Sequence, residues 1–196
     1  MKTPRLLRAA DRVAQPWRNG GGITREICCA PAAGAGESFD WRVSMAEVTG
    51  SGPFSCFPGV DRVLVVLDGR LDLDFGPQHA PVTLSSSCAP FAFAGDQAVD
   101  GSAPEGVVHD LNVMVRRDAF AAKVERVSST VNVPENGTVL LFAGEAATVD
   151  CGDSRYHLGL CDALLLSNGG TLHLKHREGA NVLLVTIVAT DQPVAS

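Results

Sequence analysis

Several patterns are absent from this sequence, and each absence excludes a class of protein. No apolar run approaches the length needed to cross a bilayer, so we expect no membrane-spanning protein. Lys and Arg number 16 against 22 Asp and Glu, and the net charge of −6 argues against direct nucleic-acid binding. The first residues include basic side chains but no apolar signal-peptide core, so we expect a cytoplasmic protein.

Signatures of common catalytic and metal centres are also missing. The six cysteines form no C-x-x-C pair, which argues against structural zinc and indicates reduced thiols. No G-x-S-x-G motif is present to hold a nucleophilic serine. The five histidines include no H-x-H pair, and His173 and His176 would point to opposite faces of one strand. We therefore expect neither a metal nor another cofactor.

Strand patterns dominate what is present. Residues 39–48 alternate apolar and polar side chains, and residues 62–75 read as a hairpin in which Asp-Gly separates two runs. Further short strand-like segments, separated by Gly, Pro, Asp and Asn, continue to the end of the chain, which is typical of a sandwich or barrel. Only residues 117–125 are predicted as a helix.

An internal repeat indicates two copies of one β-unit. Placing residues 63–75 over 164–176 aligns Gly69 with Gly170 and Leu71 with Leu172. We therefore predict an all-β bicupin: two antiparallel, jelly-roll-like cupin barrels packed together, with few short helices. The predicted halves are residues 1–118, with a ligand pocket, and 119–196, with a structural role. We predict a structural role for the second half because this alignment places Ala163 where the first half has Arg62. If Arg62 belongs to a binding site, only the first half carries that site.

The segment QPWRNGGGITREI, residues 15–27, contains three consecutive glycines. A phosphate-binding loop would need a following Lys or helix, and this segment has neither. Two interpretations remain: a tight turn with positive φ, or a loop whose backbone N–H groups approach a ligand. Trp17 and Asn19 have polar groups that suit the second. If the loop shapes the rim of the first barrel, Gly21→Val should damage folding or ligand binding.

Polar side chains share strand faces in the first half. Arg42 and Ser44 share one face of residues 39–48, and Asn112 shares a face of the strand near residue 112 with Asp110 and Met114. Such a face can be an ordinary solvent-exposed sheet surface. The presence of methionine favours a barrel lumen that holds a small polar ligand. Arginine binds carboxylates through its planar guanidinium, which makes Arg42 and Arg62 candidates for that role.

With these stretches in view, the chain resembles the HutD/Ves family of bicupin proteins. The matching segments are PWRNGGGITREI, FDWRVSMAEV, GPFSCFPGVDRVLVVLDG, FAFAGD and HDLNVMVRR. The resemblance implies a metal-free bicupin linked to histidine utilisation, which restrains expression of that pathway and has N-formyl-L-glutamate as a ligand. The ligand-binding residues that we predict are Arg62, Arg42, Ser44, Asn112, Trp17, Asn19, Thr24 and His109.

Three functions remain in view at this point. The first is a non-catalytic sensor of a small anionic carboxylate. The second is an enzyme, either a metal cupin or a metal-free one that acts on a small carboxylate with His109 and Asp110. The third is a module that binds a regulator protein. A homodimer is compatible with each of them.

Overall fold

The computed structural model describes residues 3–31, 39–177 and 181–190. These residues form nineteen strands and one short 3-10 helix, η1 (Ala9–Asp11). None of the described residues forms a helix long and apolar enough to cross a membrane. The chain divides into two compact units: Val13–Ala119, and Met1–Arg12 together with Phe120–Ser196. The predicted boundary at residue 118 lies close to this division, but the prediction assigned residues 1–12 to the first half, whereas they cluster with the second.

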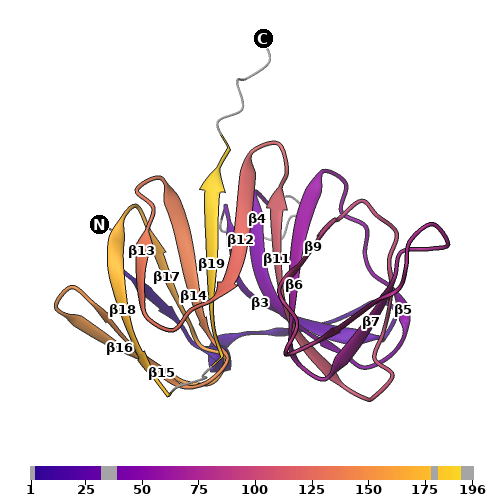
Figure 1. Ribbon diagram of the computed structural model, residues 1–196, viewed down its shortest axis with the longest axis horizontal. Helices are drawn as coiled ribbons and strands as arrows, with labels where there is room; N and C mark the ends of the chain where they lie inside the picture. Colours follow the sequence, from indigo (N-terminus) through magenta and orange to yellow (C-terminus); the bar gives the residue numbers. More distant parts are fainter. Residues whose placement is uncertain (1–2, 32–38, 178–180, 191–196) are drawn as a thin grey trace, which may run out of the picture. The chain divides into compact units, whose positions relative to one another are not determined.

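The unit Val13–Ala119 contains two antiparallel sheets (Figure 1). The six-stranded sheet has the order β2 (Ala14–Pro16), β3 (Gly22–Ala30), β4 (Trp41–Val48), β11 (Val108–Arg116), β6 (Val60–Asp68), β9 (Phe91–Ala94). The four-stranded sheet has the order β5 (Gly52–Pro53), β10 (Asp100–Ser102), β7 (Arg70–Asp74), β8 (Val82–Ser85). Strands far apart in sequence alternate in both, which is the arrangement of a jelly roll. Both sheets contribute to one apolar core that includes Leu64, Leu71 and Leu73.

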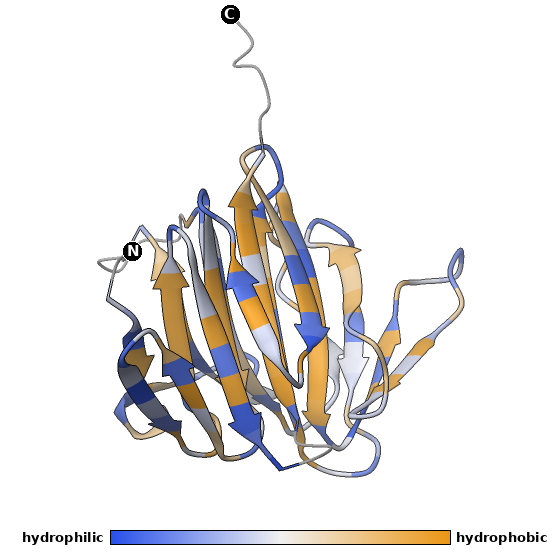
Figure 2. Ribbon diagram, turned by 60° about the vertical axis from the view of Figure 1, so that its left-hand side comes forward, coloured by the Kyte–Doolittle hydropathy of each residue, from blue (hydrophilic) through white to orange (hydrophobic). Residues whose placement is uncertain are grey.

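The second unit repeats this topology. Its first sheet has the order β1 (Arg5–Leu7), β17 (Ala163–Ser167), β14 (Gly137–Ala143), β19 (Val182–Ala189), β12 (Phe120–Arg126). Its second sheet has the order β13 (Thr130–Val133), β18 (Gly170–His176), β15 (Ala147–Cys151), β16 (Ser154–Leu158). Apolar and polar residues alternate along many of these strands (Figure 2), and the buried members form a separate core around Leu141, Leu164 and Leu172. The predicted all-β fold of two jelly-roll-like cupin halves is confirmed.

The predicted hairpin at residues 62–75 is wrong. β6 and β7 are consecutive strands, but β6 pairs with β9 and β11, while β7 pairs with β8 and β10. The Asp-Gly step therefore moves the chain from one sheet to the other. Gly69 has φ +84°, and a Cβ there would lie 2.8 Å from the Val107 carbonyl oxygen, so the crossing requires glycine.

The internal repeat exists, but its alignment compared the wrong strands. Matching the strand orders of the two units places β6 and β7 over β14 and β15, whereas β17 and β18 match β9 and β10. Leu71 then falls on Ala147 and Leu73 on Val149, and all four are buried. The core-facing residues of β14, Val139, Leu141 and Ala143, are all apolar, so the second unit has no arginine on the strand that matches β6.

The predicted helix at residues 117–125 is also wrong, since Phe120–Arg126 forms β12 and pairs with β19. The segment is rich in good helix formers, but Ala122 and Val124 face inward while Ala121 and Lys123 are exposed. That two-residue period matches a sheet surface, and pairing with a long buried strand outweighs the local helix preference.

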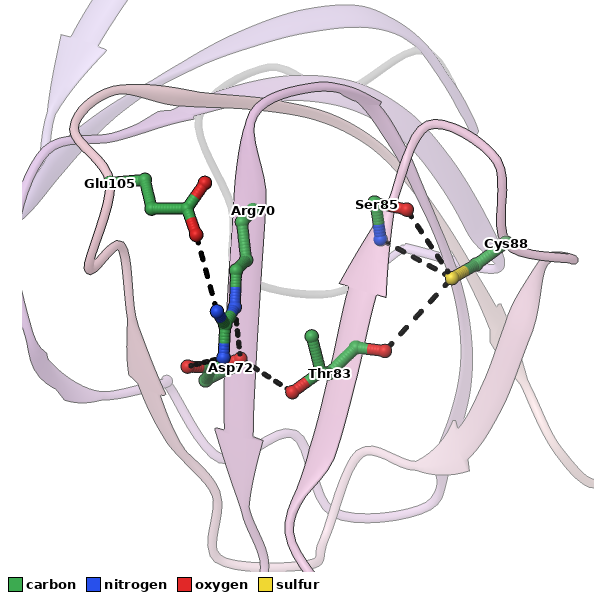
Figure 3. A network of polar contacts seen from close by, with 6 residues as sticks. All are labelled: Arg70, Asp72, Thr83, Ser85, Cys88 and Glu105. Atoms are coloured by element: carbon green, nitrogen blue, oxygen red, sulfur yellow. Dashed lines mark hydrogen bonds and ion pairs between the residues drawn. The ribbon is translucent and has the colours of Figure 1, made fainter.

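A network of polar contacts lies on the exposed side of β7 and β8 (Figure 3). Arg70 binds Asp72 and Glu105, and the Thr83 hydroxyl donates to Asp72 over 2.7 Å. The Ser85 N–H donates to the Cys88 sulfur. These pairs join β7, β8 and the segment before β11, and they include none of the predicted ligand-binding residues.

Asp162 joins the N-terminal segment to the rest of the second unit. Its carboxylate accepts from the Arg8 guanidinium at 2.7 Å, the Ala9 N–H at 2.8 Å and the Gly159 N–H at 2.9 Å. Burial by itself raises the pKa of Asp162, but the backbone donors and Arg8 outweigh it and hold the pKa below its ordinary value. The carboxylate is therefore a stabilising group only when it is ionised.

We expect Asp162→Asn to lower the free energy of unfolding by about 1–2 kcal/mol at pH 7, because one charged acceptor with three donors is lost. A carboxylate whose pKa is lower in the folded state stabilises the native protein at pH values above its unfolded-state pKa. That stabilisation is lost as the pH falls through the folded-state pKa. The difference between wild type and variant in urea unfolding should therefore shrink below about pH 4. A difference that stays constant down to pH 2 would contradict this assignment.

Candidate functional site

The register of three strands brings the predicted polar residues to one face of the six-stranded sheet. Asn112 on β11 lies opposite Ser44 on β4 and Leu64 on β6. Met114 lies opposite Arg42 on β4 and Arg62 on β6. Leu64 belongs to the core between the two sheets, so this face is the barrel lumen. We call Arg42, Ser44, Arg62, Asp110 and Asn112 the arginine cluster.

Arg62 is the most deeply buried cation of the arginine cluster, with an exposed fraction of 6%. Its Nε donates to Asn112 Oδ1 at 3.5 Å. Its Cζ lies 4.9 Å from the ring centroid of Phe93, 5.5 Å from Phe54 and 5.8 Å from Phe57. Burial lowers the pKa of Arg62 to about 10, with nearby Asp110 opposing the shift and Arg42 adding to it. The guanidinium therefore stays charged at neutral pH.

Arg42 extends the same positive region. Its Nη2 donates to Met114 Sδ at 3.3 Å, and its Cζ lies 5.1 Å from the Phe39 ring centroid. Its Nε is buried and has no hydrogen-bond partner among the residues that the structure describes. Burial lowers the pKa of Arg42, while Glu26 and Cys29 act in the opposite direction. Within the described part of the chain, no carboxylate lies within ion-pair distance, 4 Å, of Arg42 or Arg62.

Asp110 was not among the predicted ligand-binding residues, although strand alternation placed it on the same face as Asn112. Its exposed fraction is 2%, and its Oδ1 is buried with no hydrogen-bond partner in the described structure. Burial raises the pKa of Asp110 to about 7, against the opposing charge of Arg62. The lumen therefore contains two guanidiniums and one carboxyl group that titrates near neutral pH.

The aromatic residues around the arginines were also missed. Phe54 and Phe57 come from the segment that directly precedes β6, and Phe93 comes from β9, where it lies opposite Arg62. The repeated phenylalanines just before the arginine strand were the available signal, because a buried guanidinium is often stacked on aromatic rings. Such rings hold the guanidinium in place without neutralising its charge.

The glycine run forms a turn beside the cluster. Gly20 has φ +72°, as expected for a tight turn, and Asn19 Oδ1 accepts from the Gly21 N–H at 3.0 Å. Trp17 Nε1 donates to Thr24 Oγ1 at 2.8 Å, and the Trp17 ring meets Phe54 edge-on at 6.0 Å. Asn19, Trp17 and Thr24 therefore fix the turn and the position of Phe54.

His109 lies apart from the arginine cluster. Its side chain is 40% exposed, and its Nε2 lies 3.9 Å from Glu47 Oε2. Asp110, the next residue, is buried toward the lumen, so the two do not form the acid–base pair that an enzyme would use. In the described residues, no three His, Cys, Asp or Glu side chains come together as metal ligands.

A cavity of about 220 Å³ lies elsewhere in the same unit. It is lined by Phe75, His79, Ala80, Val82, Phe91, Ala92, Phe93 and Gln97. Only Phe93 also contacts Arg62. We regard the arginine cluster as the better candidate site, because it concentrates buried charge and unsatisfied polar atoms, whereas the cavity has an almost wholly uncharged lining.

Comparisons with known proteins agree with this architecture. Protein Ves of Citrobacter koseri is 43% identical over 131 residues, covering 65% of this chain and 67% of the relative. A 21.2 kDa protein from the hutC 3′ region of Pseudomonas putida is 33% identical, covering 88% of this chain and 91% of its own. The structure of HutD from Pseudomonas fluorescens, determined in a formate condition, has a TM-score of 0.81 at 28% identity, covering 96% of this chain and all of that one.

More distant structures share the fold alone. The bacterial pirin YhhW from Escherichia coli, solved in complex with nickel(II), has a TM-score of 0.61 at 10% identity, covering 95% of this chain and 99% of its own. The HutD family model matches residues 9–184, which takes in both units and the whole arginine cluster. The chain therefore belongs to the HutD family, which is linked to the histidine-utilisation region.

Proposed function

We propose that the arginine cluster binds a small dicarboxylate, N-formyl-L-glutamate, and that the protein acts as a non-catalytic sensor in histidine utilisation. The observation that carries this proposal is the pair of guanidiniums on one lumen face, Arg62 buried and Arg42 half-buried, with no carboxylate within ion-pair distance in the described structure. Taking a charge out of water is costly unless a partner of opposite sign replaces the lost hydration. An anionic ligand supplies that partner.

The rest of the cluster suits a ligand with additional polar atoms. Ser44 is 1% exposed and Asn112 is 8% exposed, and both lie on the lumen face beside the arginines. A hydroxyl and an amide can each donate or accept, so they can bind a formamide oxygen or a second carboxylate. The phenylalanine rings beside Arg62 provide an apolar wall for the methylene groups of such a ligand.

Regulation by this protein would act through another protein. The chain has a net charge of −6, which opposes the phosphate contacts that direct DNA binding requires. We therefore propose that the liganded form restrains expression of the pathway by binding a regulator protein.

Thermal unfolding with ligand tests the binding step. N-formyl-L-glutamate at 100 times its dissociation constant should stabilise the native state by about 2.7 kcal/mol, seen as a clear rise in Tm. Urocanate is the matched control, because it has one carboxylate rather than two and should give a smaller shift at equal concentration. Equal Tm values with and without N-formyl-L-glutamate at millimolar concentration would rule the sensor out.

A further inference from the structure

The charges in the lumen do not balance a dicarboxylate. Arg42 and Arg62 supply two positive charges, and Asp110 supplies one negative charge when it is ionised. A ligand with two carboxylates, whose ordinary pKa values are near 4, carries two negative charges at neutral pH. The occupied site would then hold one uncompensated buried negative charge, which is strongly unfavourable in a low-dielectric interior.

Asp110 is the group placed to correct this imbalance. Its Oδ1 is buried and has no hydrogen-bond partner in the described residues, and Asn112 and Arg62 lie beside it on the same lumen face. In the empty site, the positive charge of Arg62 favours the ionised carboxylate. A ligand carboxylate bound to Arg62 removes that advantage and adds a like charge nearby, so it favours the protonated acid.

The surrounding strands provide no competing group of similar burial. From β4 the charged side chain that faces the lumen is Arg42, and from β6 it is Arg62. On β3 the register places Glu26 level with Ser44, but Glu26 is exposed to solvent. β9 contributes the uncharged Phe93, and Phe54 lies against Arg62 from the segment after β5. His109 lies beside Glu47, away from the lumen.

We propose that Asp110 takes up one proton from solvent when the arginine cluster binds a dicarboxylate, so that the site selects a dianion together with that proton. The new O–H donates to the ligand carboxylate, which forms a charge-assisted hydrogen bond and satisfies an otherwise unpartnered buried group. The inference rests on the proposed carboxylate-binding function and assigns Asp110 as its specificity-determining residue. A monocarboxylate needs no such proton, because the cluster already has one positive charge in excess.

Isothermal titration calorimetry of the whole chain with N-formyl-L-glutamate tests this inference. Titrations at pH 8 in two buffers of different ionisation enthalpy should show about one proton taken up per ligand, falling toward zero at pH 6. Because ligand binding and proton binding are linked, the dissociation constant should be about tenfold larger at pH 8 than at pH 6. The proton count uses the wild-type protein alone, so it does not depend on the folding of any variant.

Asp110→Asn supplies the matched test, because asparagine has the same shape and no proton to gain. The variant should bind with a dissociation constant that is constant between pH 6 and pH 8, and no larger than that of the wild type at pH 6. Asp100→Asn, the same change at an exposed position on β10, should keep the tenfold pH dependence.

The outcomes of these experiments distinguish proton uptake by Asp110 from the proposed carboxylate binding. Binding with no proton uptake, or with proton release, would overturn the role of Asp110 and leave carboxylate binding intact. Binding that weakens in Asp110→Asn at both pH values would do the same, because it would show an ionised acceptor for a ligand N–H group. Absence of any binding heat at either pH would overturn the carboxylate site and the proton uptake together.

Discussion

Replacing Arg62 with methionine is expected to abolish the rise in Tm that N-formyl-L-glutamate produces. A fork-like contact from a buried guanidinium to a carboxylate comprises two charge-assisted hydrogen bonds, each contributing about 1.5–3 kcal/mol. Their loss should weaken binding by at least about 100-fold. Methionine fills much of the space between Phe54, Phe57 and Phe93, so the variant should remain folded without ligand. Thermal unfolding and calorimetry measure both results.

The control for this variant is Arg70→Met. Arg70 is an arginine of the same unit, but it lies on the exposed side of the four-stranded sheet and binds Asp72 and Glu105 (Figure 3). Its loss should leave the ligand-induced shift unchanged, since exposed ion pairs contribute little. If Arg62→Met keeps the full shift, the ligand binds elsewhere, and the aromatic cavity next to Phe93 becomes the site to examine.

Gly22→Ala should lower the free energy of unfolding by about 3 kcal/mol, the second large effect that we expect. A Cβ at this position would lie 2.5 Å from the Glu47 carbonyl oxygen and 3.1 Å from the Trp17 ring. Glu47 belongs to β4, which pairs with β3 along its length, so its backbone cannot move away without disrupting the ladder. Urea unfolding should show a clearly lower midpoint with an unchanged slope.

Gly21→Ala is the matched control, and its effect should be below about 1 kcal/mol. The three atoms nearest to a Cβ there all belong to the side chain of Asn19, the closest at 3.4 Å. The sequence argument chose Gly21→Val as its test of the glycine run, whereas the close backbone approach in the structure is at Gly22. Equal destabilisation by the two alanines would show that the turn itself, rather than the approach of β4, sets the constraint.

Period-two patterns predicted the face of the arginine cluster well. Alternation along residues 41–48 and 108–116 was enough to place Arg42 with Ser44, and Asn112 with Asp110, because side chains on a strand alternate without exception outside a bulge. Alternation along one strand does not predict which strands pair with one another. The proximity of Arg62 to Asn112 depends on β11 lying between β4 and β6, which is a property of the whole jelly roll.

The errors share one physical origin. The Asp-Gly step after β6 has the composition of a hairpin turn, and the segment after Arg117 has the composition of a helix. Both local preferences are worth about 1 kcal/mol or less per residue, and burial of a strand face contributes more. His109 lies apart from the arginine cluster for a related reason. It is the neighbour of Asp110 on β11, and adjacent residues of a strand point to opposite faces.

The pairing of β1 with β17 has a consequence for synthesis of the protein on the ribosome. Arg5 lies opposite Leu165, so β1 pairs with a strand that is synthesised much later than itself. Residues 13–119 can fold as soon as they emerge, while β1 stays without its partner strand until most of the chain has been translated. Removal of β1 would therefore destabilise the second unit, which contains β17, and leave the unit Val13–Ala119 intact.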